Sequence, residues 1–151
     1  MLGNGTDLVL EPGHLTLDDL RMIYEGEHKL SLDPTCRDVV EAAAAAVKHI
    51  VDENKTAYGI NTGFGRLAQE VIPADKLEDL QRNLVLSHST GVGPLLGDNI
   101  VRLIMVMKAA SLARGFSGVR FEVIDALLTF IGHEIYPCIP AKGSVGASGD
   151  Q

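Results

Sequence analysis

The chain has few of the residues that mark nucleic-acid-binding, metal-binding and disulfide-linked proteins. Its 151 residues include no tryptophan and only two cysteines, Cys36 and Cys138, which do not have a metal-type spacing. Its 13 basic residues are outnumbered by 20 acidic ones, which gives a net charge of -7, and no basic stripe is present to attract a polyanion. We therefore expect no nucleic-acid partner, no metal, and two cysteines that are reduced and buried.

Long hydrophobic runs are also missing. The most apolar stretch, residues 99–113, is shorter than a membrane span and contains Arg102 and Lys108. The first residues do not show the basic and then apolar pattern of a signal peptide. We therefore expect a cytoplasmic protein with no membrane partner.

Apolar residues, in contrast, are plentiful. They make up 46% of the chain, which is enough for one domain with a real core and argues against disorder. No internal repeat, low-complexity tract or linker interrupts the sequence. We therefore expect residues 1–151 to form a single domain.

The pattern of apolar and turn residues predicts a mainly α fold with a small strand pair near its start. Residues 8–10 and 29–32 are short apolar or alternating runs between turn residues, so we expect them to pair as strands. Between them, Thr16 and Asp19 form a capping-box pattern. This pattern predicts a helix that Gly26 ends.

Apolar residues at helical spacing predict four further helices. One begins after the pair Asp33-Pro34 and ends near Asn54, and the others are expected at about 75–89, 99–113 and 119–135. We expect Asp98 to cap the third of these four, which is apolar on nearly every side and is therefore typical of a helix buried in a large core or between subunits. The inward face of the last helix is expected to comprise Phe121, Ile124, Leu127, Leu128 and Ile131.

A glycine-rich segment near residue 151 contains Ala147-Ser148-Gly149, whose chemistry permits an electrophile to form. Because Gly149 lacks a side chain, its backbone nitrogen can approach the carbonyl carbon of Ala147 closely. Attack there closes a five-membered ring, and loss of two waters, one from the Ser148 hydroxyl, leaves an imidazolone with an exocyclic methylene. Proteins otherwise lack a good electrophilic side chain. The same tripeptide is an ordinary turn in most proteins, so the rest of the chain decides between the two interpretations.

Four segments, in order along the chain, together resemble the aromatic amino acid ammonia-lyases. They are Thr-Ala-Tyr-Gly-Ile-Asn-Thr-Gly-Phe-Gly at 56–65, Asn-Leu-Val-Leu-Ser-His at 83–88, Ser-Leu-Ala-Arg-Gly-Phe-Ser-Gly-Val-Arg at 111–120, and Gly-Ser-Val-Gly-Ala-Ser-Gly-Asp at 143–150. The resemblance covers roughly the first third of a family member. It implies the N-terminal portion of the family's helical-bundle fold and a homotetramer. It also implies 4-methylidene-imidazol-5-one, formed autocatalytically from Ala147-Ser148-Gly149, with no external cofactor.

The resemblance assigns roles to residues of the first and last of these segments. Tyr58 corresponds to the base that removes the β-proton of the substrate, and the small residues around it would expose its oxygen. A phenol is a weak base at neutral pH, so this role requires positive charge or hydrogen-bond donors nearby. An aromatic residue between small ones is otherwise a packing residue. Asn61 is expected to contact the substrate, and Asp150 either holds the loop for cyclisation or is simply a turn former.

His88 has two interpretations. It follows Leu77, Leu80 and Leu84 at helical spacing, and a histidine on an apolar helix face is ordinarily a buried, hydrogen-bonded core residue. The pair Ser87-His88, however, resembles the histidine-specific branch of the family. In that branch His88 would bind the imidazole of the substrate, and the reaction would be the non-oxidative deamination of L-histidine to urocanate and ammonia in histidine degradation.

Other chemistries are not indicated. The glycine-rich segments lack a Walker lysine, no serine lies in Gly-x-Ser-x-Gly, and no His-Glu-x-x-His metal motif is present. One alternative stays open: a truncated, catalytically inactive lyase fragment that acts only as a helical assembly module. The family's site uses several subunits and residues downstream of the electrophile, so we expect the 151-residue chain alone to be inactive and its full-length parent to act on histidine.

Overall fold

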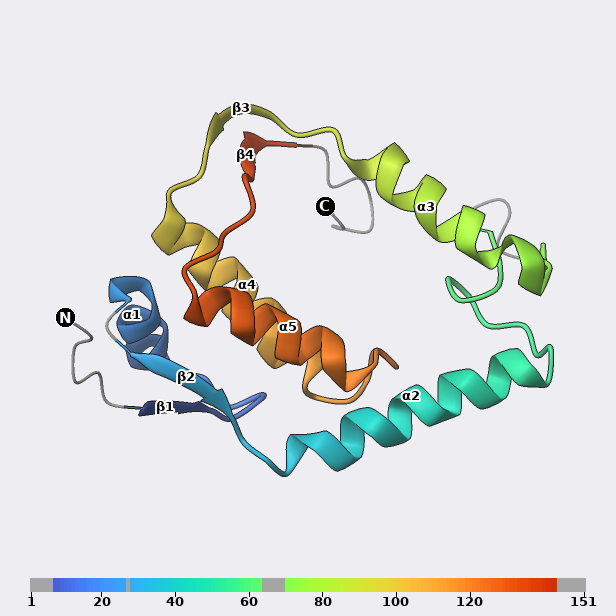
Figure 1. Ribbon diagram of the computed structural model, residues 1–151, viewed down its shortest axis with the longest axis horizontal. Helices are drawn as coiled ribbons and strands as arrows, with labels where there is room; N and C mark the ends of the chain where they lie inside the picture. Colours follow the sequence, from blue (N-terminus) through green and yellow to red (C-terminus); the bar gives the residue numbers. More distant parts are fainter. Residues whose placement is uncertain (1–6, 27, 64–69, 144–151) are drawn as a thin grey trace. The chain divides into compact units, whose positions relative to one another are not determined.

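The structure is a computed structural model that describes residues 7–26, 28–63 and 70–143 (Figure 1). These residues are mainly helical, as predicted, and they also form small strand pairs, of which the one near the start of the chain was predicted. They fall into two compact units: unit 1 lies within Met1–Ala45 and Leu95–Ile139, and unit 2 lies within Ala46–Pro94 and Pro140–Gln151. The single domain over residues 1–151 stays a prediction. Among the described residues, no helix is both long and apolar enough to cross a bilayer.

Unit 1 begins with the predicted strand pair. Strand β1 (Asp7–Leu10) pairs in parallel with β2 (Lys29–Leu32), so that Leu10 lies opposite Leu32. Parallel neighbours need a crossover connection, and here the connection contains helix α1 (Leu17–Glu25). Leu10 of β1 and Leu30 of β2 lie in the same apolar cluster as Ile23 of α1.

Helix α1 has both of the ends that the sequence predicts. The Thr16 hydroxyl accepts a hydrogen bond from the Asp19 backbone N–H at 3.2 Å, and the Asp19 carboxylate accepts one from the Thr16 N–H at 2.8 Å. This is a complete capping box. The backbone and side-chain hydrogen bonds from Thr16 lower the pKa of Asp19. At the other end Gly26 adopts φ 81°, a left-handed conformation that ends the helix.

Three longer helices complete unit 1 or begin in it. They are α2 (Cys36–Asp52), which continues into unit 2, α4 (Asp98–Leu112) and α5 (Phe121–Gly132). All three lie where they were predicted. The N-cap of α4 was predicted wrongly: Gly97 is the cap, it makes no side-chain bond, and Asp98 is the first helical residue. Its carboxylate still lies in the first turn, where a negative charge is favourable.

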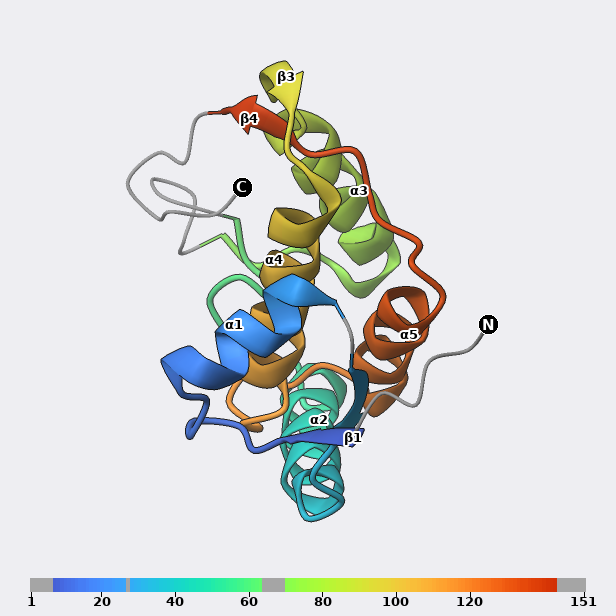
Figure 2. The same cartoon turned by 90° about the vertical axis from the view of Figure 1, so that its left-hand side faces the viewer.

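The core of unit 1 is built around α4, which packs against both α1 and α5 (Figure 2). One cluster of buried apolar residues joins α1 and the strands to α4, and a second joins α2, α4 and α5. The predicted inward face of α5 is confirmed: Phe121, Ile124 and Ile131 are buried, and Leu127 and Leu128 are partly buried against the same clusters. One side of α4 is thus buried within unit 1, while Ile100, Ile104 and Met107 on the same helix remain exposed.

The two cysteines are both free, but only one is buried. Cys36 packs in the second cluster, where burial and the nearby Asp33 carboxylate raise the pKa of its thiol. Cys138 is exposed, so its predicted burial is wrong. It lies between Pro137 and Ile139 in an irregular segment that follows α5, and there is no helix face there to turn its side chain inward.

Unit 2 contains the end of α2, a 3₁₀ turn η2 (Ala74–Lys76), helix α3 (Leu77–His88) and a second strand pair. The predicted helix at 75–89 is therefore confirmed. The second pair, β3 (Val92–Leu95) with β4 (Pro140–Lys142), was not predicted. Its strands are short and rich in Gly and Pro, which read as turn residues in a single sequence.

Candidate active site

The predicted site residues that the structure describes all lie in unit 2. Tyr58 and Asn61 follow α2, and His88 is the last residue of α3. The tripeptide Ala147-Ser148-Gly149 and Asp150 lie outside the described residues. The structure therefore describes the chain up to Gly143 and not the tripeptide itself.

Tyr58 stands on a tight turn and is well exposed, with 65% of its surface accessible. The turn is closed by two backbone hydrogen bonds to the Ala57 carbonyl, one from Ile60 N–H at 3.1 Å and one from Asn61 N–H at 3.2 Å. Gly59, which follows Tyr58, has φ 75°, a conformation that favours glycine. The local backbone therefore presents the phenol at the surface of the chain.

Two buried polar residues lie directly behind this turn. Asn61 is 4% exposed, and its amide oxygen accepts a hydrogen bond from Ala57 N–H at 2.8 Å while its amide nitrogen donates to the Lys55 carbonyl at 2.8 Å. Thr62 is fully buried, and its hydroxyl accepts from Gly59 N–H at 3.2 Å and donates to the Gly63 carbonyl at 3.0 Å. Both atoms of the Asn61 amide are used within the loop; the role predicted for it in substrate binding stays a prediction.

The far side of the loop is tied back to the chain that precedes α3. Ile72 N–H donates to the Asn61 carbonyl at 2.8 Å, and Gly63 N–H donates to the Glu70 carbonyl at 3.1 Å. Thr62 and Val71 form an isolated antiparallel bridge. The Tyr58 turn is thus fixed by hydrogen bonds on both sides.

His88 is exposed at the C-terminal end of α3, which differs from the buried core histidine of the first interpretation. Its Nδ1 lies 2.9 Å from the Leu84 carbonyl oxygen and 3.0 Å from the Ser87 hydroxyl. When Nδ1 carries the proton and donates it to the carbonyl, Nε2 is left as a hydrogen-bond acceptor. This arrangement suits the binding of an N–H group.

The strand pair β3 and β4 connects the end of α3 with the chain that leads to the tripeptide. Gly91 packs so tightly on the Pro140 ring that a Cβ atom on it would lie 2.8 Å from Pro140 Cγ. Beside it, Gly93 has φ 94° and faces the Lys142 side chain. Because β4 is paired, the chain leaves Lys142 from a fixed strand, only a few residues before Ala147.

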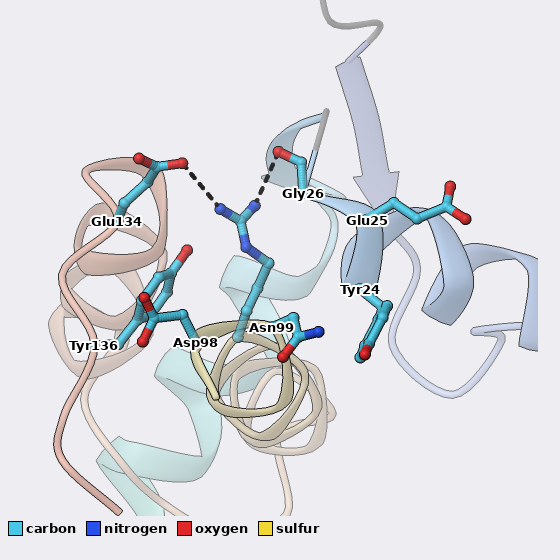
Figure 3. Close-up of a pocket in the computed structure, with 8 residues that line it drawn as sticks. Tyr24, Glu25, Gly26, Asp98, Asn99, Glu134 and Tyr136 are labelled. Carbon is cyan, nitrogen blue, oxygen red and sulfur yellow. Dashed lines mark hydrogen bonds and ion pairs between the residues drawn. The ribbon is translucent and has the colours of Figure 1, made fainter. Parts of the chain in front are cut away.

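A cavity in unit 1 contains none of the predicted site residues (Figure 3). Its volume of about 330 Å³ would hold a small molecule, and it is lined by Tyr24, Glu25, Gly26, Asp98, Asn99, Arg102, Glu134 and Tyr136. Arg102 is 8% exposed and reaches the Gly26 carbonyl at 3.4 Å and the Glu134 carboxylate at 3.5 Å. Since three carboxylates outnumber this one guanidinium, the cavity does not favour an anion. Arg102 instead links α4 to the ends of α1 and α5.

The sequence analysis missed two of these polar residues. Thr62 lies inside the motif that pointed to Tyr58, but nothing in the linear sequence indicates that its hydroxyl is buried and makes two hydrogen bonds. Arg102 did carry a signal, because it interrupts an otherwise apolar helix, yet it was counted only as a charge. A charged or polar residue in the middle of an apolar pattern is therefore worth examining for a buried partner.

Comparisons with curated proteins agree with the motifs. A family model described as aromatic amino acid lyase matches residues 15–151. The chain is 56% identical over 147 residues to a histidine ammonia-lyase of Pseudomonas fluorescens, a match that covers 97% of the chain and 29% of that relative. It is 52% identical over 144 residues to one from Psychromonas ingrahamii, which covers 95% of the chain and 28% of the relative. The chain thus spans less than a third of the length of the curated relatives it matches.

Comparisons with solved structures give the same fold. A tyrosine aminomutase from Streptomyces globisporus superposes with a TM-score of 0.87 at 28% identity, over 95% of this chain and 27% of that one. A histidine ammonia-lyase from Trypanosoma cruzi superposes with a TM-score of 0.81 at 34% identity, over 94% of this chain and 27% of that one. The predicted fold class, the N-terminal portion of an ammonia-lyase fold, is confirmed.

Proposed function

Because the chain belongs to the aromatic amino acid lyase family, we propose that it is part of an ammonia-lyase that converts L-histidine into urocanate and ammonia. The observation that carries this proposal is the match of more than 50% identity to proteins named histidine ammonia-lyase. The family model, which matches residues 15–151, includes the Tyr58, His88 and Ala147-Ser148-Gly149 segments. The family model and the exposure of Tyr58 and His88 in unit 2 support the same conclusion.

The residues of the chain are suited to form 4-methylidene-imidazol-5-one. Ala147-Ser148-Gly149 has the glycine nitrogen, carbonyl carbon and hydroxyl that the cyclisation needs, and the paired strand β4 leads into it. Once formed, this ring supplies the electrophile that activates an amino acid for loss of ammonia. Asp150 is proposed to hold the segment in the conformation for cyclisation.

Tyr58 is proposed as the base. Its side-chain oxygen accepts a proton from the β carbon of the substrate, and the electron pair of that C–H bond becomes the double bond between the α and β carbons. The C–N bond then breaks, and ammonia leaves with its electron pair. The position of Tyr58 on an exposed, well-fixed turn supports this role because a base must reach its proton at hydrogen-bond distance.

His88 is proposed to select histidine. The bond from Nδ1–H to the Leu84 carbonyl leaves Nε2 to accept the N–H of the substrate imidazole. A phenyl or phenol ring offers no N–H at that place. An analogue that lacks this N–H leaves Nε2 without its hydrogen-bond partner in the complex, and its binding is weakened accordingly.

The homotetramer, the cytoplasmic location and the contact between Asn61 and substrate stay predictions of the resemblance. We expect the 151 residues expressed alone not to turn over histidine, since the relatives are more than three times as long. The alternative, a helical assembly module without catalysis, predicts in addition that the ring never forms in this chain.

Two measurements test the proposal. The intact mass of the purified chain should be lower by two waters, in the peptide that contains Ser148, and a Ser148→Ala variant should not show this deficit. In a full-length protein, Tyr58→Phe should lower kcat by about 10²–10⁴-fold, the range of general base catalysis. Full activity of that variant would remove Tyr58 from the chemistry.

Selectivity is tested separately with His88→Leu. We expect histidine to be preferred over phenylalanine and tyrosine by the unmutated full-length protein, and the variant to lose about tenfold or more in kcat/KM for histidine. His133→Leu is the matched control, because His133 also lies exposed at a helix end with Nδ1 2.8 Å from a carbonyl four residues earlier. A preference for phenylalanine in the unmutated protein would show that the selectivity assigned to His88 is wrong.

A further inference from the structure

We propose that Asn61 and Thr62 are positioning residues that fix the backbone on both sides of Tyr58, an inference that rests on the proposed role of Tyr58 as the base. Neither residue needs to touch the substrate for this role. Their side chains act on the backbone of the Tyr58 turn, and through it on the place and direction of the phenol oxygen.

The hydrogen bonds of the turn cover consecutive peptide groups without a gap. The Asn61 side chain holds the Lys55 carbonyl and the Ala57 N–H, which belong to the two peptide groups before the Ala57–Tyr58 bond. The carbonyl of that bond accepts two backbone N–H groups. The next peptide group, between Tyr58 and Gly59, is held through its N–H by the Thr62 hydroxyl.

Burial makes these bonds obligatory. Asn61 is 4% exposed and Thr62 is fully buried, so neither side chain can exchange its partners for water at low cost. Each side chain both accepts and donates a hydrogen bond: the Asn61 amide accepts from Ala57 and donates to Lys55, and the Thr62 hydroxyl accepts from Gly59 and donates to Gly63. Loss of either side chain therefore leaves backbone groups of the turn unpaired inside the protein.

Precise placement matters for a base that is itself exposed. Tyr58 is 65% exposed, and its side chain moves with the backbone that carries it. A shift of about 1 Å in a catalytic group can lower a rate by ~100-fold, so a turn loosened by loss of Asn61 or Thr62 would slow the proposed chemistry through the phenol.

The experiment compares Thr62→Val with Thr62→Ser in the full-length protein. Valine has the shape of threonine but loses both hydrogen bonds, whereas serine keeps the hydroxyl. We expect Thr62→Val to lower kcat by about 10–100-fold with KM for histidine changed less than about threefold, and Thr62→Ser to retain most of the activity. Hydrogen exchange of the peptide that spans residues 56–63 should accelerate in the valine variant and not in the serine variant.

Several results would overturn the inference. Equal activity of the valine variant and the unmutated protein would do so if the exchange of the loop accelerates, since the turn would then be loosened without consequence. A Thr62→Ser variant whose kcat is as low as that of Thr62→Val would also overturn it. For Asn61, a raised KM with unchanged kcat in Asn61→Ala would identify a substrate contact instead of a positioning residue.

The failure of the proposed function would look different. If Tyr58→Phe were fully active, Tyr58 would not be the base, yet the exchange measurements would still report whether Asn61 and Thr62 fix the turn. If the exchange is unchanged in Thr62→Val, the positioning role fails whatever Tyr58 does. Thermal unfolding of both Thr62 variants, followed by circular dichroism, separates loss of positioning from loss of the fold.

Discussion

Units 1 and 2 bury different kinds of side chain. Among the residues that the structure describes, every buried apolar side chain belongs to unit 1, in the two clusters around α4 or next to them. The buried polar side chains of unit 2 are Asn61 and Thr62, and no described residue of α3 is buried. The candidate chemistry thus lies in the unit that is held mainly by directional bonds.

This difference indicates what each unit requires of its sequence. Apolar burial is not directional, and it stabilises roughly in proportion to the area removed from water. A single hydrogen bond contributes little net free energy to folding, but it fixes geometry. A donor or acceptor left without a partner inside the protein destabilises the fold. Unit 1 should therefore be sensitive to changes of volume, and unit 2 to changes that remove a donor, an acceptor or a close backbone approach.

The largest effect is expected from a cavity in unit 1. Ile124 on α5 is fully buried between α2 and α4, so Ile124→Ala should lower the free energy of unfolding by about 2–5 kcal/mol. Val85→Ala on α3, where the side chain is 67% exposed, should change it by less than ~0.5 kcal/mol. Urea unfolding followed by far-ultraviolet circular dichroism measures both. Similar losses in the two variants would abolish the contrast between the units.

Two glycines of unit 1, one crowded and one open, provide a second test. Gly115 has φ 76°, and a Cβ atom there would lie 2.9 Å from the Val39 carbonyl oxygen, so Gly115→Ala should destabilise the fold by about 1–3 kcal/mol. The control is Gly132→Ala at the end of α5, where a Cβ would meet no described atom within 4 Å. That variant should be neutral or stabilised by up to ~1 kcal/mol. The same urea unfolding measures both, and a neutral Gly115→Ala would mean that α2 and the turn after α4 can separate at little cost.

Sequence patterns predicted most of unit 1 because its signals are local or periodic. The capping box of α1 and its terminal Gly26 depend on residues a few positions apart, and the buried face of α5 follows from the helical repeat. The exceptions have a common cause. The cap of α4 and the exposure of Cys138 depend on how a connecting segment runs in space, which no local pattern specifies.

Less of unit 2 could be predicted. The motif around Tyr58 located the candidate base, and the helix that carries His88 was placed within two residues. The strand pair β3 and β4 was missed because its pairing joins distant segments that look like turns. The exposure of His88 and the internal bonds of Asn61 and Thr62 depend on three-dimensional packing, and in the linear sequence each of these residues has several equally good interpretations.

A third prediction tests the close approach in unit 2. Gly91→Ala places a methyl group against the rigid Pro140 ring, at 2.8 Å from Cγ, and should weaken the pairing of β3 with β4 by about 1 kcal/mol or more. Hydrogen exchange of residues 90–95 should accelerate while α4 and α5 stay protected. In the background of Pro140→Ala the same change should have a smaller effect, because the clashing ring is gone. Equal effects in both backgrounds would show that the glycine matters for another reason.

The smallest expected effect concerns the capping box of unit 1 and appears as a dependence on pH. The hydrogen bonds from Thr16 lower the pKa of Asp19 in the folded chain. The contribution of the Asp19 carboxylate to the stability of the fold is therefore fully present above its unfolded pKa of about 3.9, and it is lost as the pH falls through its folded pKa. Asp19→Asn should therefore lower the melting temperature at neutral pH and flatten its decline below about pH 4. Asp18→Asn removes the same charge from the same helical turn, so it controls for the helix dipole. Because both charges lie near one helix end, only the specific bonds to Thr16 can make the two variants differ. Identical pH profiles for the two variants would mean that charge near the helix end, and not the box, stabilises α1.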